Sequence, residues 1–365
     1  MWNFHNPVAV HAGTGSLAQL PRLLAGRRAL LLTFPEAREL GMEQHLGELL
    51  GAELAGIENQ VQANPDVGWL PAMYERVWSR HRDVECIVAF GGGSVIDCAK
   101  AMLAPTKSGR FDELLAHLRD GAPLEATGAK ALIAIPTTAG TGSEVTPWAA
   151  IWDAAAGNKY SLHRPWTWPE AAIVDPQLTL GLPPGATLAS GLDALSHALE
   201  AIWNLNRNPL SSTLAAAAAR EILTTLPLLM RKPGDLALRE RMAMAALQAG
   251  LAFSNTKTAL AHSLSYDITL QHGVAHGIAC SFSLPRVMRL AFGRDAAVDA
   301  LLLQIFGAAG QEAAIERLSA FLEDLGVSTD PARYGIADAW DALLQRALQG
   351  PRGRNFIAAV NRSTA

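Results

Sequence analysis

The sequence has little cysteine: Cys86, Cys98 and Cys280 are the three cysteines among 365 residues. They are odd in number, lie far apart and form no CxxC pair. This pattern argues against a disulfide framework and against a thiolate zinc site. We therefore interpret all three as buried apolar residues.

An excess of one charge and a long apolar run are also missing. Lysine and arginine number 30 against 34 acidic residues, so the net charge of −4 leaves no basic surface for nucleic acid. No apolar run reaches the ~18 residues that a membrane span requires. The first residues, MWNFHNP, lack the basic and apolar regions of a signal peptide. We expect a soluble cytoplasmic protein that binds neither nucleic acid nor membranes.

The sequence is rich in apolar residues, which make up 50% of the chain, while 18% are charged. This composition allows a large core and excludes wholesale disorder. A chain of this length predicts two domains, at roughly 100–200 residues each. After residue 182 strand-like runs disappear and Ala/Leu-rich helical segments dominate. We therefore predict an α/β domain over residues 1–180 and an all-helical domain over residues 181–365.

Short apolar runs in the first half have the length of buried parallel strands. They cover residues 28–33, 86–90 and 131–135, with helical patterns over 35–50 and 67–79. Strands that alternate with helices indicate a parallel, Rossmann-like, doubly wound sheet.

Two loops follow neighbouring strands of this predicted sheet. The first begins with Gly91, Gly92, Gly93 and Ser94, directly before a helix. Glycines at a helix start let a phosphate approach the backbone N–H groups, although a tight turn alone would need one glycine. The second loop, PTTAGTGSEVT over residues 136–146, is polar. Two loops at adjacent strand ends indicate a ligand site, and a pyrophosphate suits the first.

The helical half contains a carboxylate and several histidines. Asp193 and His197 are four residues apart, so they share one helix face. His262, His272 and His276 follow downstream. One carboxylate with three imidazoles suits Fe(II) or Zn(II) better than Ca(II). The spacing accepts either His272 or His276 as the last ligand.

Four motifs in this order resemble the iron-containing, or group III, alcohol dehydrogenases: GGGSVIDCAK, PTTAGTGSEVT, VDP (residues 174–176) and GLDALSHALE. These enzymes share a fold with dehydroquinate synthase. The resemblance implies a dinucleotide-binding domain for NAD or NADP, an all-helical domain, and a divalent metal, Fe(II) or Zn(II), between them. By analogy it also implies a homodimer or a larger homo-oligomer.

The resemblance also implies site residues. The metal ligands are Asp193, His197, His262 and His276; the last is preferred over His272 because Gly277 and Pro285 follow it at the family's distances. Phe34 stands where many members have an aspartate that repels a 2′-phosphate, so the choice between NAD and NADP stays open. The residues expected at the cofactor are Asn64, Gly92, Gly93, Ser94, Asp97, Thr137, Thr138, Thr141 and Lys159. Residue patterns alone would make Lys159 a solvated surface lysine.

Three further residues are candidates for catalysis or substrate binding. Tyr266 replaces a histidine that many members place near the nicotinamide, and it either hydrogen-bonds or only packs. His272, expected one helical turn from His276, competes for the proton relay. Lys257, expected within a helix, either extends into solvent or receives an acidic substrate tail. This stretch resembles the branch that interconverts phosphonoacetaldehyde and 2-hydroxyethylphosphonate.

We therefore predict a metal-dependent NAD(P) alcohol dehydrogenase that works mainly as an aldehyde reductase on a small aldehyde, such as a phosphonate-bearing one. The alternatives within the fold are a maleylacetate reductase-like enzyme, a general short-chain alcohol dehydrogenase and a dehydroquinate synthase-like lyase. A catalytically silent nucleotide-binding protein is the alternative from another class.

Overall fold

The computed structural model describes residues 1–124 and 128–359 and divides into two compact units. The first is an α/β unit of residues 7–138 and 143–179. The second is a helical unit that begins at residue 180 and includes two earlier segments, 1–6 and 139–142. The expected domain of residues 1–180 is therefore corrected at these two segments, whose contacts lie mainly with the helices.

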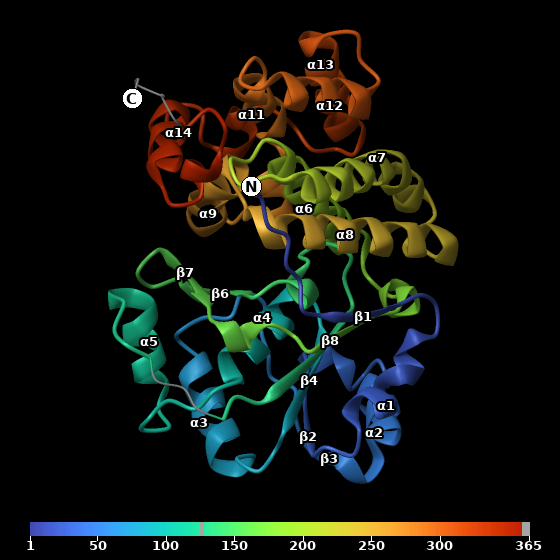
Figure 1. Ribbon diagram of the computed structural model, residues 1–365, viewed down its shortest axis with the longest axis vertical. Coiled ribbons are helices and arrows are strands. Elements are labelled where there is room, and N and C mark those ends of the chain that lie inside the picture. Colours follow the sequence, from blue (N-terminus) through green and yellow to red (C-terminus); the bar gives the residue numbers. More distant parts are fainter. Residues whose placement is uncertain (125–127, 360–365) are drawn as a thin grey trace. The chain divides into compact units, whose positions relative to one another are not determined.

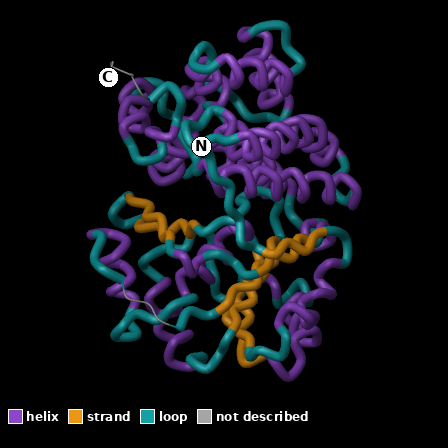
Figure 2. The backbone as a smooth tube through the Cα atoms, viewed as in Figure 1, coloured by secondary structure: helices purple, strands orange, loops and turns teal. Residues whose placement is uncertain are grey.

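The α/β unit contains a six-stranded sheet in the order β1-β8-β5-β4-β2-β3, in which every pairing is parallel. Figure 2 draws the strands in orange. β6 and β7 form a separate antiparallel pair. The predicted runs 28–33, 86–90 and 131–135 are confirmed as β2, β4 and β5. The strands are β1 (Ala9–Ala12), β2 (Ala29–Leu32), β3 (Leu54–Glu58), β4 (Cys86–Gly91), β5 (Ala131–Pro136), β6 (Trp148–Asp153), β7 (Asn158–His163) and β8 (Ala171–Val174).

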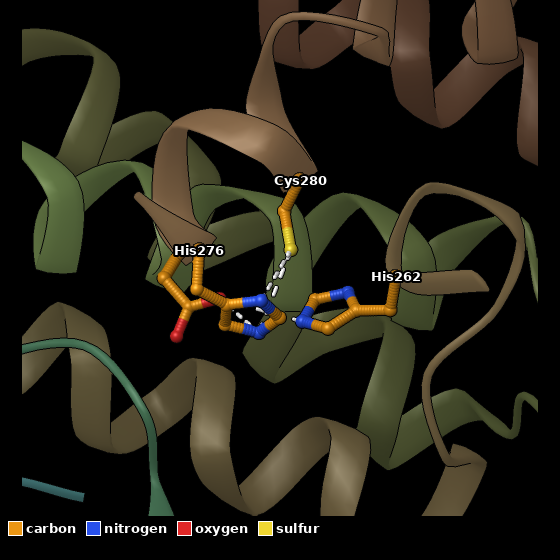
Figure 3. Close-up of side chains that lie close together, drawn as sticks. His262, His276 and Cys280 are labelled. Carbon is orange, nitrogen blue, oxygen red and sulfur yellow. Dashed lines mark hydrogen bonds and ion pairs between the residues drawn. The ribbon is translucent and has the colours of Figure 1, made fainter. Parts of the chain in front are cut away.

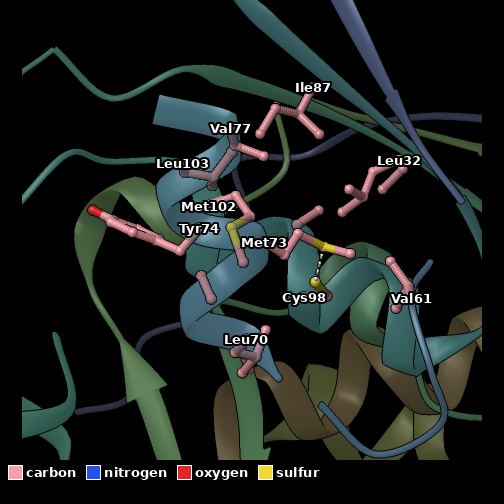
Figure 4. Packing of buried hydrophobic residues seen from close by; sticks show 14 of the residues in the cluster. Leu32, Val61, Leu70, Met73, Tyr74, Val77, Ile87, Cys98, Met102 and Leu103 are labelled. Atoms are coloured by element: carbon pink, nitrogen blue, oxygen red, sulfur yellow. Dashed lines mark hydrogen bonds between the residues drawn. The ribbon is translucent and has the colours of Figure 1, made fainter. Parts of the chain in front are cut away.

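Both faces of the sheet are buried, as parallel sheets require. Along β2, Leu30 and Leu32 face one apolar cluster, and Ala29 and Leu31 face the other. Figure 4 shows part of the first cluster, where Met73 packs beside Cys98. The helices that cover the sheet are α1 (Leu20–Leu24), α2 (Met42–Leu50), α3 (Leu70–Arg80), α4 (Gly93–Met102) and α5 (Phe111–Asp120).

The helix expected over residues 35–50 is interrupted. A 3₁₀ turn covers Pro35–Ala37, and α2 begins only at Met42, after Gly41 with a φ of 72°. Such a positive φ suits glycine and does not continue a right-handed helix. The expected helix at 67–79 is observed as α3, which begins three residues later.

The strand order reverses once next to the glycine loop. From β2 the chain first adds β3 on one side and then crosses to add β4 on the other. Ligands of open α/β sheets bind at the carboxyl ends of the strands where this reversal occurs. The fold therefore places Phe34, after β2, and Gly92, after β4, at the expected ligand position.

The second unit is helical, with α6, α7 and α8 packed on one another (Figure 1). The all-helical prediction for this half is thereby confirmed. Its helices are α6 (Pro184–Ile202), α7 (Pro209–Arg231), α8 (Leu236–Thr256), α9 (Leu260–His272), α10 (His276–Ser281), α11 (Leu284–Ala291), α12 (Ala296–Phe306), α13 (Gln311–Asp324) and α14 (Trp340–Gln349).

One helix of the described residues, α7, is long and apolar enough by composition to cross a membrane, and the bent pair α12 and α13 would pass the same test together. Core helices of soluble proteins also pass it. Because α7 packs against α6 and α8, this feature is weak evidence for a span.

Candidate functional site

Three helices carry the expected metal ligands. Asp193 and His197 lie on α6, His262 lies on α9, and His276 is the first residue of α10. His272 does not share a helix with His276, because α9 ends at His272 and Gly273 follows with a φ of 65°. The expectation that these two histidines are one helical turn apart is therefore wrong. His272 is exposed, whereas Asp193, His197 and His262 are buried.

The donor atoms converge around the Asp193 carboxylate. Its Oδ1 lies 3.3 Å from Nε2 of His262, 3.9 Å from that of His197 and 4.0 Å from that of His276. The ligand atoms of Asp193, His262, His276 and Cys280 all lie within 4.8 Å of one another. Figure 3 shows the last three of these side chains together. Sequence reasoning missed Cys280 because its spacing matched no thiolate motif.

His197 lies beside this group of four. Its ring stacks on Phe253 at 4.1 Å and on His262 at 4.5 Å, measured between ring centroids. Its Nδ1 lies 3.3 Å from the carbonyl oxygen of Gly140. If that contact is a hydrogen bond, Nδ1 carries the proton and Nε2 keeps a lone pair on the Asp193 side.

Glu200, on α6, fixes the tautomer of His262. Its carboxylate accepts a hydrogen bond from Nδ1 of His262 at 2.7 Å, and it also accepts from the backbone N–H groups of Ala259 and Ala261. An ionised carboxylate cannot donate, so the proton of this bond belongs to the imidazole. When a metal ion displaces the other proton, the ring presents its lone pair at Nε2. Glu200 is the last residue of the GLDALSHALE motif, but the sequence did not predict its role, because the contact joins α6 to α9.

Two buried atoms are left without hydrogen bonds. Within the described residues, Oδ1 of Asp193 and Nε2 of His262 have no hydrogen-bond partner, although they lie 3.3 Å apart. The two atoms are close enough to share a proton or a metal ion, and buried polar atoms are rarely left unsatisfied. A cation between them would satisfy both. A carboxylate with imidazoles and a thiol is a donor set that suits Fe(II) or Zn(II), so these residues fit such an ion.

The charges of the site favour the same conclusion. Burial opposes ionisation of Asp193, but the histidines around it, led by His197, lower the pKa of this carboxyl below its usual range. Burial lowers the pKa of His197 to about 4, so its imidazole is neutral at pH 7. Burial alone would lower the pKa of His262, but Cys280 and Glu200 outweigh burial and raise it. Surroundings that favour a proton on His262 also favour a metal ion.

We expect Glu200→Gln to weaken metal binding about 10–100-fold, the usual effect of removing a carboxylate that orients a ligand histidine. The reason is that glutamine no longer demands a proton on Nδ1 of His262. Isothermal titration of the apoprotein with Zn(II) measures this change. Glu316→Gln, at an exposed position on α13, should leave the affinity unchanged. Equal affinities of both variants would contradict the role of Glu200.

Tyr266 and Arg352 extend the site beyond His276. The Tyr266 ring lies parallel to the His276 ring, with 6.1 Å between their centroids. The Arg352 guanidinium lies 4.7 Å from the centroid of the Tyr266 ring, and its Nε donates to Thr258. Lys257 is exposed and forms the C-cap of α8 with a φ of 67°. The expectation that Lys257 lies within a helix is wrong, because α8 ends one residue earlier.

The glycine loop of the α/β unit joins several expected cofactor residues. A Cβ on Gly91 would clash with Val95, and one on Gly92 would lie 3.3 Å from Thr138, so the turn depends on glycine. The N–H of Thr137 donates to Gly91, and the N–H of Asn64 donates to Oγ of Ser94. Gly93 and Ser94 begin α4. The first backbone N–H groups of a helix have no hydrogen-bond partner within it. Asn64, Gly92, Gly93, Ser94, Thr137 and Thr138 therefore lie together.

Asp97 has partners within the protein. Its carboxylate accepts from Oγ of Ser143 at 2.6 Å and from the N–H of Ala150 at 2.9 Å. Lys100, fully buried, donates to the carbonyl and hydroxyl oxygens of Ser143 and to the carbonyl of Trp148. These bonds anchor the segment after the PTTAGTG loop. The pKa of Lys100 is lowered to about 8 by burial.

Lys159 and Thr141 are the two remaining residues that were expected at the cofactor. Lys159, on β7, is half-buried, and its Nζ lies 4.7 Å from the centroid of the Trp152 ring. The solvated surface position that residue patterns favoured is therefore not observed. Thr141 belongs to the short segment 139–142 that is part of the helical unit.

Comparisons with known proteins show to which protein family this chain belongs. The chain matches the family described as "Iron-containing alcohol dehydrogenase" over residues 7–176 and "Fe-containing alcohol dehydrogenase family, C-terminal" over residues 187–362. It therefore belongs to the iron-containing alcohol dehydrogenases, as the motif resemblance predicted.

Two relatives are similar to this chain over somewhat more than half of its length. The chain is similar to "Probable alcohol dehydrogenase EutG" of Salmonella typhimurium strain LT2, at 40% identity over 213 residues, 57% of this chain and 52% of that protein. It is 37% identical to "Phosphonoacetaldehyde reductase" of Streptomyces viridochromogenes over 205 residues, 55% of this chain and 52% of that protein. The matched stretch thus spans about half the length of these relatives.

A solved structure matches along nearly the whole chain. It is the crystal structure of sulfoacetaldehyde reductase from Bifidobacterium kashiwanohense in complex with NAD⁺. The TM-score is 0.88 at 28% identity, and the match covers 98% of this chain and 94% of that one. The predicted fold is thereby confirmed.

Proposed function

We propose that this protein is a metal-dependent NAD(P) alcohol dehydrogenase that works mainly as an aldehyde reductase. The observation that carries the proposal is the buried pair of Asp193 Oδ1 and His262 Nε2, which lie 3.3 Å apart without a hydrogen-bond partner among the described residues, in a chain that belongs to the iron-containing alcohol dehydrogenases. In this proposal Asp193, His197, His262 and His276 hold the ion.

The α/β unit would bind the dinucleotide. Gly92, Gly93 and Ser94 would receive the pyrophosphate on backbone N–H groups at the start of α4, with Asn64, Thr137 and Thr138 beside it. Asp97 and Lys100 would act indirectly, by fixing the Ser143 segment. At the end of β2, Phe34 stacks on Phe90 and offers no carboxylate against a 2′-phosphate. NADP(H) is therefore not repelled at this position, and the proposal covers both NAD(H) and NADP(H).

The residues around the donor set divide the chemistry between them. A bound divalent ion supplies Lewis-acid polarisation of a carbonyl oxygen. Asp193 stays ionised, His197 stays neutral, and Glu200 holds the lone pair of His262 toward Asp193. Burial raises the pKa of the Tyr266 hydroxyl, which therefore keeps its proton as a hydrogen-bond donor. Tyr266, next to His276, is a better candidate for proton delivery than the exposed His272.

We further propose that the aldehyde carries an anionic tail, such as a phosphonate. Arg352 supports this idea, because it is half-buried over Tyr266 and its two terminal nitrogens make no hydrogen bond within residues 1–124 and 128–359. Lys257 adjoins Thr258, the residue that holds Arg352. Two cations are thus supplied from one side of the helical unit. The similarities to reductases of phosphonoacetaldehyde and sulfoacetaldehyde point to the same substrate class.

The substrate proposal predicts different effects on charged and neutral aldehydes. Arg352→Ala should raise KM for phosphonoacetaldehyde about 10–100-fold, since a charge-assisted hydrogen bond contributes roughly 1.5–3 kcal/mol. KM for propanal should change little. Lys257→Ala should show the same selectivity with a smaller effect, because its side chain is exposed.

Matched controls lie close by in the chain. Arg354→Ala removes an exposed arginine two residues after Arg352. Lys232→Ala removes an exposed lysine that is the C-cap residue of α7. Neither should discriminate between the two aldehydes. Equal changes in KM for both aldehydes in Arg352→Ala would refute the anionic substrate and leave the dehydrogenase activity intact.

The activity itself is tested by oxidation of NADH and NADPH with a panel of small aldehydes, with Fe(II), Zn(II) or a chelator. We expect turnover that the chelator abolishes and either metal restores. Turnover with maleylacetate that survives the chelator would favour the maleylacetate reductase-like alternative. Tight NAD(P) binding without turnover under any metal would favour the catalytically silent protein.

A further inference from the structure

Cys280 lies on the same helix face as His276, one turn further along α10. Its Sγ is 3.7 Å from Nε2 and 3.8 Å from Nδ1 of the His276 ring, and the thiol is buried (Figure 3). The sequence alone suggested an apolar packing role for this cysteine. A weak S–H hydrogen bond to the imidazole would be the corresponding structural role.

The distances fit a shared ion. Zn–N and Zn–O bonds near 2.0–2.1 Å with a Zn–S bond near 2.3 Å place tetrahedral ligands roughly 3.3 Å apart for N and O, and roughly 3.6 Å apart for N and S. The observed separations are 3.3 Å between His262 Nε2 and Asp193 Oδ1, 3.7 Å between His276 Nε2 and Cys280 Sγ, and 4.0 Å between His276 Nε2 and Asp193 Oδ1. Because Cys280 Sγ lies almost as close to Nδ1 of His276, at 3.8 Å, the imidazole must rotate before its Nε2 and the sulfur bind one ion. Oδ1 of Asp193 and Nε2 of His262, which have no hydrogen-bond partner among the described residues, are two of these atoms.

The backbone holds Cys280 in this position. Gly277 follows His276 directly, and a Cβ there would clash with the carbonyl oxygen of Ala189 on α6. α10 therefore packs against α6, the helix that carries Asp193, without room for a side chain between them. Asp193, His276 and Cys280 are thus fixed on two helices in close contact.

We propose that the sulfur of Cys280 is a direct ligand of the metal ion, a role that rests on the proposed metal centre and that the resemblance does not assign. The thiol gives up its proton to solvent when the sulfur coordinates. A sulfur donor selects borderline ions such as Zn(II), Co(II) and Fe(II) over Mg(II) or Mn(II). His197 keeps its place as a further donor on the other side of Asp193.

Cobalt substitution tests this ligand without relying on activity. The full-length apoprotein is loaded with one equivalent of Co(II), and its visible and near-ultraviolet absorption is recorded. We expect weak d–d bands together with an intense thiolate-to-cobalt charge-transfer band. Cys280→Ser and Cys280→Ala should keep d–d bands, lose the charge-transfer band and bind Co(II) at least tenfold more weakly.

Cys86→Ser and Cys98→Ser provide matched controls, because both thiols are buried in the α/β unit and should leave the band unchanged. X-ray absorption of the Zn(II) form gives a second measurement, with a sulfur shell at roughly 2.3 Å in the wild type that both Cys280 variants lose. This measurement does not depend on how well a variant folds, because the wild type alone decides it.

The outcomes separate the two proposals. Cobalt bound with d–d bands but without a charge-transfer band or a sulfur shell would refute Cys280 as a ligand and leave the metal centre standing. No stoichiometric cobalt or zinc in the wild type would instead overturn the metal-dependent function. A charge-transfer band that survives in Cys280→Ala would assign the sulfur to another cysteine and overturn the inference.

Discussion

Asp193→Asn is expected to abolish metal binding and to lower kcat/KM for aldehyde reduction by about 1,000-fold or more. A Lewis acid contributes several kcal/mol to the stabilisation of a transition state, and each 1.4 kcal/mol is a factor of ten. Asp193 is the one donor that lies within 4.0 Å of all three histidines. Metal content after dialysis, measured by plasma emission, and NAD(P)H oxidation check the two effects.

Three comparisons test whether the loss of metal from Asp193→Asn reflects the loss of a ligand. His276→Ala should lose the metal, whereas His272→Ala should keep it, since His272 is exposed at the end of α9. The apo form of Asp193→Asn should melt lower than the apo wild type at pH 7, because the lowered pKa of Asp193 means that its ionised carboxylate stabilises the fold. Retention of a full equivalent of metal by Asp193→Asn, or its loss from His272→Ala, would show that the ion binds elsewhere.

Lys100→Met is expected to lower the free energy of unfolding of the α/β unit by about 3–5 kcal/mol, because three buried acceptors lose their donor. These acceptors are two oxygens of Ser143 and the carbonyl of Trp148. Methionine has a similar length, so the loss reflects hydrogen bonds rather than a cavity. Urea denaturation followed by far-ultraviolet circular dichroism measures the change.

Lys107→Met, at an exposed position in the same unit, is the control and should change the stability by less than about 0.5 kcal/mol. Lys100→Met should also weaken NAD(P)H binding, since the segment after the PTTAGTG loop loses its anchor. Unchanged stability would mean that water replaces the ammonium group at these acceptors. The proposed positioning role of Lys100 would then be wrong.

The residue pattern predicted local structure best where a single element carried the signal. β4 and β5 were expected over residues 86–90 and 131–135 and extend one residue further, because buried parallel strands are short apolar runs. Asp193 and His197 were expected on one helix face, and both lie on α6. The glycine loop after β4 was likewise predicted from the sequence, because the strand, the glycines and the helix follow one another directly in the chain.

Two errors came from continuing a helical pattern too far. Lys257 was expected inside a helix, and His272 was expected on the helix of His276. Backbone conformations with positive φ at Lys257 and Gly273 end α8 and α9 at these points. Glycine signals such an end, but a lysine in this conformation does not. The side chains of Asn204 and Thr256, which both donate to the Lys257 carbonyl, show how the turn is held.

The sequence by itself determined the fold class and the four residues expected to hold the metal, because both depend on local periodicity and on ordered motifs. Only the tertiary structure showed what surrounds those residues. Glu200, Cys280 and Arg352 come to the site from α6, α10 and the segment after α14, and the sequence did not predict their contacts with His262, His276 and Tyr266. Their roles arise from helix packing, which brings distant side chains within bonding distance.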